Sequence, residues 1–126
     1  MAIDIVMQGP VLTGQAGAQV REMVHDIAAR VTEAVTVDVH AYLPGVLKHP
    51  TGVFEGSLVG DMVGPSMGRV FSDLVYAPWL EGTSKRNQST RFKGYHTFRL
   101  ITAEFRAGRA AEVARPVVAE HVGRMS

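Results

Sequence analysis

Residues 75–99, VYAPWLEGTSKRNQSTRFKGYHTFR, place the only tryptophan of the chain directly beside its most strongly basic segment. The stretch begins like the end of a buried strand, passes Trp79 and the pair Glu81-Gly82, and continues as a polar run rich in Lys and Arg. Large aromatic rings are usually buried, whereas a run of like charges is typically solvated. We therefore expect residues 84–95 to form an extended basic loop whose base is held by Trp79.

The segments before this stretch predict a strand and one long helix. Residues 1–12 open with the alternating sequence AIDIV and predict an N-terminal strand or arm. Thr13 is a suitable N-cap, and from Gln15 apolar residues recur every three or four positions. This periodicity predicts a long amphipathic helix to about Leu43, before Pro44-Gly45. The alternation of valines at residues 35, 37 and 39 would also suit a strand.

Two strand-like segments follow, at residues 52–62 and 67–77, with the turn sequence VGPSMG at their junction. They predict an antiparallel hairpin that packs on the long helix, with Pro78 ending the second strand and Trp79-Leu80 adding a helical turn. From about Tyr95 the apolar spacing predicts a C-terminal helix, kinked at Gly108 or Pro116; the residues that set this spacing are Phe98, Ile101 and Phe105.

The predicted fold class is therefore α+β. A long N-terminal amphipathic helix and a C-terminal helix pack on a small antiparallel β-sheet that carries a long basic loop. The chain has 126 residues, of which 46% are hydrophobic, and this fits a single domain over residues 1–126. It has no cysteine, which excludes disulfides and thiolate metal sites.

The charge of the chain is strongly uneven, although its formal net value is only +1. Residues 1–84 carry four basic and nine acidic side chains, whereas residues 85–109 carry seven basic and one acidic. This distribution suggests an acidic partner surface or a phosphate backbone near the basic segment. A solvated loop without a partner is the alternative.

The search for catalytic groups indicates that the chain is not an enzyme. Its five histidines show no paired ligand spacing, no serine lies in a Gly-x-Ser-x-Gly sequence, and the glycine-rich segment 52–64 lacks the Lys-Ser/Thr of a phosphate loop. We expect structural or surface roles for the histidines, and no catalytic residue, metal or cofactor. No apolar run is long enough to span a membrane, so no membrane partner is expected. The N-terminus does not resemble a signal peptide.

The candidate contact residues are basic side chains that alternate with aromatic residues: Lys85, Arg86, Arg91, Lys93 and Arg99, with Phe92, Tyr95 and His96 between them. Such a pattern can bind nucleic acid by phosphate contact and stacking. Because no sequence-reading motif surrounds it, we expect at most non-specific contact with DNA.

The order of these features resembles the small neck and tail-completion (head-tail joining) proteins of long-tailed bacteriophages. The distinctive part is the sequence Tyr-Ala-Pro-Trp-Leu-Glu-Gly-Thr at residues 76–83, which follows that family's Tyr-Ala-x-aromatic-x-Glu-x-Gly-Thr pattern in order. It departs by lacking one residue between Glu81 and Gly82. It also has GYHTFR, residues 94–99, where the family has a Pro-Phe-aromatic opening of the last helix.

The resemblance implies a structural virion protein, a head-tail connector or tail-completion component without catalysis. It would form a ring around the DNA passage at the neck, of six subunits in the favoured case, and bind other neck and tail proteins. It would lie in the virion tail or neck, and in the host cytoplasm during assembly. In this interpretation the acidic face of the first helix, with Glu22, Asp26 and Glu33, meets the basic loop of the next subunit, and neighbouring subunits order that loop.

Four residues are then expected to position the loop. Tyr76 and Trp79 would anchor the strand end in the core, and Gly82 would allow the sharp departure of the chain. Glu81 would pair with Arg86 or Arg91, or accept backbone amides. The alternative function is a small stand-alone module that binds nucleic acid non-specifically through residues 85–99.

Overall fold

The computed structural model describes residues 2–6, 14–46 and 53–125. The elements in this part of the chain are β1 (Ala2–Val6), α1 (Gly14–Val46), α2 (Val53–Ser57), β2 (Val59–Gly64), β3 (Met67–Phe71), α3 (Ala77–Glu81), α4 (Lys85–Ser89), α5 (Thr97–Glu104), the π-helical turn η1 (Phe105–Arg109) and α6 (Ala110–Met125). The α+β class, the long N-terminal helix and the C-terminal helix are confirmed.

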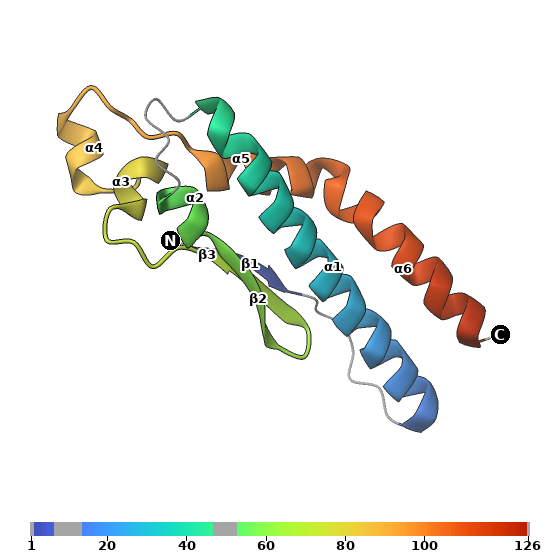
Figure 1. Cartoon of the computed structure of the whole chain (residues 1–126). Helices are drawn as coiled ribbons and strands as arrows, with labels where there is room; N and C mark the ends of the chain where they lie inside the picture. Colours follow the sequence, from blue (N-terminus) through green and yellow to red (C-terminus); the bar gives the residue numbers. More distant parts are fainter. Residues whose placement is uncertain (1, 7–13, 47–52, 126) are drawn as a thin grey trace.

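Helix α1 is the central element of an elongated molecule, with the sheet on one side and α6 on the other (Figure 1). Its buried residues follow the predicted helical spacing, from Ile27 through Val31 and Val35 to Val39 and Leu43. The helix interpretation of residues 35–39 is therefore correct. Helix α1 ends at Val46, a few residues beyond the predicted boundary, and the predicted cap Thr13 lies outside the described residues.

The described strands form an antiparallel sheet in the order β1-β3-β2. The two edge strands are in register on β3, with Ala2 and Val59 both opposite Phe71, and Ile3 and Gly60 both opposite Val70. The predicted N-terminal strand is thus confirmed for residues 2–6, and it pairs within its own chain. The rest of segment 1–12 lies outside the described residues.

Helix α1 approaches the sheet most closely at two glycines. A Cβ atom on Gly68 would lie 1.8 Å from Oγ1 of Thr32, and one on Gly60 would lie 2.0 Å from Oγ1 of Thr36. Each threonine hydroxyl donates a hydrogen bond to the helix carbonyl four residues earlier, so it is satisfied without help from the sheet. The position of α1 over β2 and β3 therefore depends on the absence of side chains at these two strand positions.

Two histidines of α1 hold the ends of the hairpin. Nδ1 of His25 lies 2.7 Å from the carbonyl oxygen of Pro65 in the turn, and Nε2 of His40 lies 2.8 Å from that of Leu58 before β2. In each pair the ring N–H donates to the carbonyl. The expected structural role of these two histidines is confirmed.

The hairpin prediction was wrong at the start of its first strand and at the end of its second strand. Residues 53–57 are helical, not extended, because Phe54 turns into the core and Ser57 Oγ donates to its carbonyl at 2.7 Å. The second strand ends at Phe71, well before Pro78, because Phe71 already lies opposite the first residues of β1 and β2. The helical turn predicted at Trp79-Leu80 is present as α3.

The C-terminal helix is kinked at Gly108, one of the two predicted positions. Gly108 has a φ of 161° and a ψ of −20°, outside the helical region; this break lies inside η1, with α5 before it and α6 after it. Helix α6 then runs antiparallel to α1 (Figure 1). His121 of α6 is buried, and its Nε2 lies 2.6 Å from Oδ2 of Asp26 on α1.

The close packing at Gly68 gives a direct test of the fold. We expect Gly68→Ala to lower the free energy of unfolding by about 1–3 kcal/mol, because the new methyl group overlaps Thr32. Gly123→Ala on α6 is the control, since a Cβ there meets no atom within 4 Å and alanine favours a helix. Urea unfolding of the two variants measures the difference, and an unchanged midpoint for Gly68→Ala would show that α1 does not approach β3 this closely.

Candidate functional site

Helix α3 forms the base of the basic segment. Pro78 lies in its first turn, where a missing N–H leaves no hydrogen bond unmade. Trp79 is half-buried, whereas Tyr76 precedes the helix and is 44% exposed. The prediction that Tyr76 and Trp79 anchor a strand end in the core was wrong, because the strand ends at Phe71 and Tyr76 lies in the following turn. Trp79 lies in α3 and packs on Phe92, so it contacts the basic segment rather than the core.

Gly82 produces the sharp departure that was predicted. It is the C-cap of α3 with a φ of 105°, and its N–H donates to the carbonyl of Pro78 at 2.9 Å. The chain returns across the same point, where Gly94 has a φ of 95° and its Cβ position would lie 2.3 Å from Gly82 Cα. Neither position accepts a side chain, so residues 93–96 can cross α3 in contact with its backbone.

Glu81 joins α3 to the start of α5. Its side chain is 6% exposed, and its carboxylate accepts hydrogen bonds from the backbone N–H of Phe98 at 2.8 Å and of Arg99 at 3.1 Å. These amides belong to the first turn of α5, where no preceding carbonyl is available, and the negative charge favours that end of the helix. Of the two roles predicted for Glu81, the structure has the acceptance of backbone amides; no ion pair joins Glu81 to Arg86 or Arg91.

The basic segment 84–95 differs from the predicted extended loop, because it contains helix α4. Ser84 and Asn87 form a capping box, in which the Ser84 side chain accepts from the start of α4 and Asn87 Oδ1 accepts from the Ser84 N–H at 3.0 Å. Asn87 is 2% exposed, and its Nδ2 donates to the carbonyls of Trp79 and Phe92. One buried side chain therefore ties α3, α4 and the returning chain together. Asn87 was not among the predicted site residues, because a single amide in a polar run resembles its exposed neighbours.

Aromatic side chains also pack on one another around residues 84–95. The ring centroids of Trp79 and Phe92 are 4.9 Å apart, and those of Phe92 and Tyr95 are 5.1 Å apart in an edge-to-face arrangement. The guanidinium carbon of Arg86 lies 5.8 Å from the Trp79 ring centroid. The segment is ordered by its own chain, which corrects the expectation that neighbouring subunits order it.

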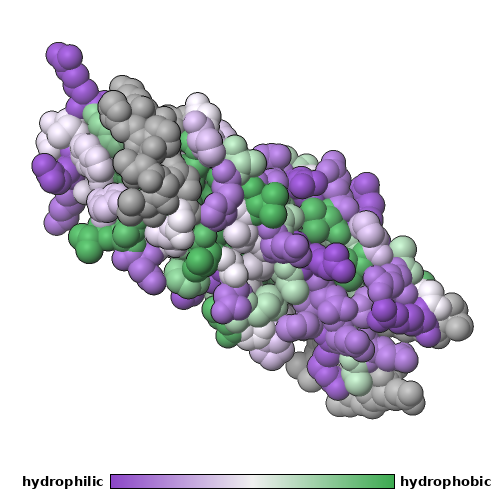
Figure 2. Space-filling model, viewed as in Figure 1, coloured by the Kyte–Doolittle hydropathy of each residue, from purple (hydrophilic) through white to green (hydrophobic). Residues whose placement is uncertain are grey.

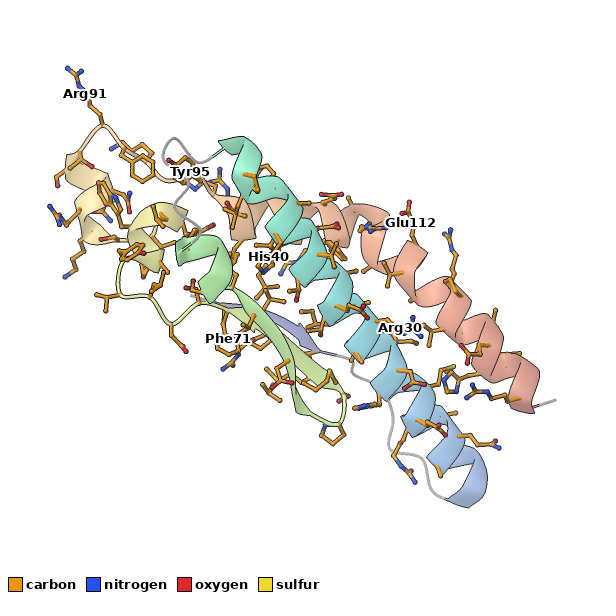
Figure 3. All side chains as sticks on the ribbon, in the orientation of Figure 1. Arg30, His40, Phe71, Arg91, Tyr95 and Glu112 are labelled. Atoms are coloured by element: carbon orange, nitrogen blue, oxygen red, sulfur yellow. The ribbon has the colours of Figure 1, made fainter. Side chains whose placement is uncertain are left out.

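The four basic side chains of this segment are exposed at one end of the molecule, a group we call the basic end: Lys85, Arg86, Arg91 and Lys93. Figure 3 shows Arg91 at the tip, pointing away from the rest of the structure, and Figure 2 shows hydrophilic side chains projecting from that end. Lys93 Nζ donates to the carbonyl of Asn87 at 2.8 Å and so caps α4. None of the four forms an ion pair with another described residue.

Arg99, the fifth candidate, lies in a groove of about 520 Å³ between β1, the C-terminal end of α3 with Glu81, and α5. We call it the basic groove; Ala2, Ile3 and Arg106 also line it. Arg99 and Arg106 are exposed and form no ion pair within the described residues. Arg106 was not among the predicted site residues, because helical spacing alone gave no reason to separate it from a solvated face.

Arg109, about one turn further along the chain, differs from Arg99 and Arg106 because its charge is paired within the chain. It lines another hollow with Asp38 and Glu112, and its Nε lies 3.3 Å from Oδ2 of Asp38. The hydrogen bond and the charge of Asp38 raise the pKa of Arg109 above its ordinary value. Arg109 therefore neutralises an acid of its own chain, whereas Arg99 and Arg106 leave their charge open to a partner.

The described residues contain no group of three or more His, Asp or Glu side chains that could hold a metal ion. The absence of an enzymatic activity stays a prediction. No helix in the described ranges is long and apolar enough to cross a membrane. No protein-family model, curated protein or solved structure matches the chain significantly.

The cap formed by Glu81 can be tested by substitution. We expect Glu81→Ala to lower the free energy of unfolding by about 1–3 kcal/mol, because two amides of α5 lose a charged acceptor in a buried position. Glu22→Ala is the control, since Glu22 is exposed on α1. Amide hydrogen exchange should rise at Phe98 and Arg99 in the first variant only; equal exchange in both would contradict the capping role.

Proposed function

We propose that the chain is a structural protein of a phage virion, a connector or tail-completion component that forms a ring at the neck between capsid and tail. The favoured ring has six subunits and surrounds the passage for DNA. It would bind other neck and tail proteins, and it would lie in the host cytoplasm during assembly and in the virion afterwards. It has no catalytic role in this proposal.

The observation that carries the proposal is the motif at residues 76–83 and what it builds. The motif residues Trp79, Glu81 and Gly82 hold the base of a basic segment at one end of an elongated molecule. A motif that fixes a surface rather than a catalytic pocket fits an assembly protein, because an assembly protein acts through the surfaces it presents.

The charges of the described structure support a role for the basic end beside DNA. Asp26, one of the three carboxylates of the predicted acidic face, is paired with His121 of the same chain, so the acidic face available to a neighbour is smaller than the sequence suggested. The basic end is ordered without a neighbour and its cations remain exposed. We therefore assign the basic end to non-specific phosphate contact in the DNA passage.

The ring is tested by the mass of the protein in solution. We expect native mass spectrometry and light scattering to give a discrete multiple of the 13.6 kDa chain, or a monomer that converts to this multiple as concentration rises. Measurements at low and high salt separate charge-dependent assembly from apolar assembly. A monomer at every concentration and salt would contradict the ring.

The alternative function, a stand-alone module that binds nucleic acid non-specifically, is favoured by one observation: the cations of the basic end are exposed and outside ion pairs with other described residues. The aromatic rings beside them are half-buried and pack on one another, which makes phosphate contact a better basis for binding than base stacking. In this function the same contact exists without any ring, so the measured mass separates the two functions.

DNA contact is tested by charge reversal. We expect Arg86→Glu with Arg91→Glu to weaken binding to short duplex DNA and to reduce the slope of log K against log salt by about two, because two phosphate contacts are lost. The double variant Arg30→Glu with Arg115→Glu has the same net charge change at exposed positions elsewhere and is the control. Equal binding by both variants would show that the basic end does not contact DNA.

A further inference from the structure

Both outer strands of the sheet have an edge that no other described strand covers. Strand β1 pairs only with β3 among the described strands, and so does β2 on the other side. Along such an edge every second residue directs its N–H and C=O away from the sheet, where another strand can pair with them. Exposed valines accompany both edges, with Val6 on β1 at 48% exposure and Val59 and Val63 on β2 at 45% and 50%.

The grooves beside these two edges carry opposite charges. The basic groove beside β1 holds Arg99 and Arg106. A groove of about 280 Å³ beside β2, which we call the acidic groove, is lined by Glu33 and Val37 of α1 and by Asp61 of β2. Glu33 is exposed and forms no ion pair with another described residue, and it is the acidic side chain on the helix-covered face, because Asp61 lies opposite Arg69 with its side chain on the other face. Val37 is 58% exposed.

The two grooves also lie at the same position along the strands of the sheet. Ile3, which lines the basic groove, and Gly60, which lines the acidic groove, are both opposite Val70. Both grooves are formed with helices, α5 at β1 and α1 at β2, on the face of the sheet that the helices cover. A second copy shifted sideways across the sheet, with little shift along the strands, therefore brings its acidic groove opposite the basic groove.

We propose that a second copy of this chain pairs its β2 edge with the β1 edge, so that Arg99 and Arg106 of one subunit face Glu33 of the next. Because β1 and β2 both run antiparallel to β3, this pairing is parallel. The contact joins two different surfaces, so each subunit keeps one open edge until a closed ring forms.

This interface rests on the proposed ring and names the surfaces that join its subunits. It uses the arginines of α5 in place of the basic loop for subunit contact, and it leaves the basic end free to face the DNA passage. The charge complementarity selects a second copy as the occupant of the β1 edge, because the acidic groove that fits the basic groove belongs to the same chain.

Cysteine cross-linking tests the pairing directly, since the chain has no cysteine of its own. Ala2 and Val59 are exposed, lie opposite the same residue of β3 and would be neighbours across the interface. Within one chain they are two strands apart, about 10 Å, which is too far for a disulfide, whereas adjacent strands are about 5 Å apart. The double variant Ala2→Cys with Val59→Cys should therefore form chains of disulfide-linked subunits under mild oxidation.

The control is Val6→Cys with Val59→Cys, which changes two exposed residues whose positions differ by four residues along the strands, about 13 Å. We expect a ladder of multimers on a non-reducing gel from the first variant and not from the control. No ladder, or equal ladders from both, overturns the interface. If native mass spectrometry of the same sample still shows a ring, the proposed function stands and only this interface fails; a monomer without a ladder overturns both.

A charge exchange tests the groove contacts separately. Arg106→Glu and Glu33→Arg should each raise the dissociation constant for assembly about threefold to tenfold, because each places like charges across the interface. The two changes in one chain restore opposite charges between residues 33 and 106, so assembly should recover relative to either single variant. Additive loss in the double variant overturns the contact between these two residues.

Discussion

The close packing of α1 against Gly60 and Gly68 is the constraint on which the rest of the structure depends. Because these strand positions carry no side chain, Thr32 and Thr36 bring the helix axis down onto β2 and β3. Helix α5 packs against α1 and beside β1, the strand at the other edge of the sheet. The basic groove at β1 and the acidic groove at β2 both follow from this off-centre position of α1.

Hydrogen bonds of buried polar side chains, rather than apolar packing, hold the basic end in place. Glu81 ties α3 to the first turn of α5, while Asn87 ties α3 and the returning chain to α4. Buried polar groups of this kind are costly unless every partner is present, so they specify one arrangement. The exposed cations are consequently presented by a segment that is held internally, and no neighbouring subunit is needed to order it.

The sequence was sufficient for features that repeat along the chain and insufficient for those that depend on single contacts. The spacing from Ile27 to Leu43 predicted α1, and Gly108 marked the kink before α6. Residues 53–57 were assigned to a strand because one helical turn is too short to show a period. Tyr76 was placed in a strand because the sequence does not reveal that β1 and β2 begin opposite Phe71.

In the candidate site too, roles that depend on the chemistry of one residue could be predicted, whereas roles that depend on its neighbours in the fold could not. The predicted role of Gly82 and one of the two roles of Glu81 follow from the chemistry of the residues and are present in the structure, whereas Trp79 contacts the basic segment and not the core. Asn87 is a single amide in a polar run, and nothing in the sequence separates it from its exposed neighbours. Arg106 becomes a candidate contact residue only because it lies beside β1, and the strand order β1-β3-β2 places β1 at the edge of the sheet.

The central claim of this account is that the subunits join edge to edge and close into a ring. Electron microscopy of the purified protein at high concentration, with averaging of single particles, tests this claim most directly. Closed rings of one size with a central opening are expected, because each subunit has two different open edges and closure pairs both. Two-fold dimers or isolated monomers at all concentrations would contradict it.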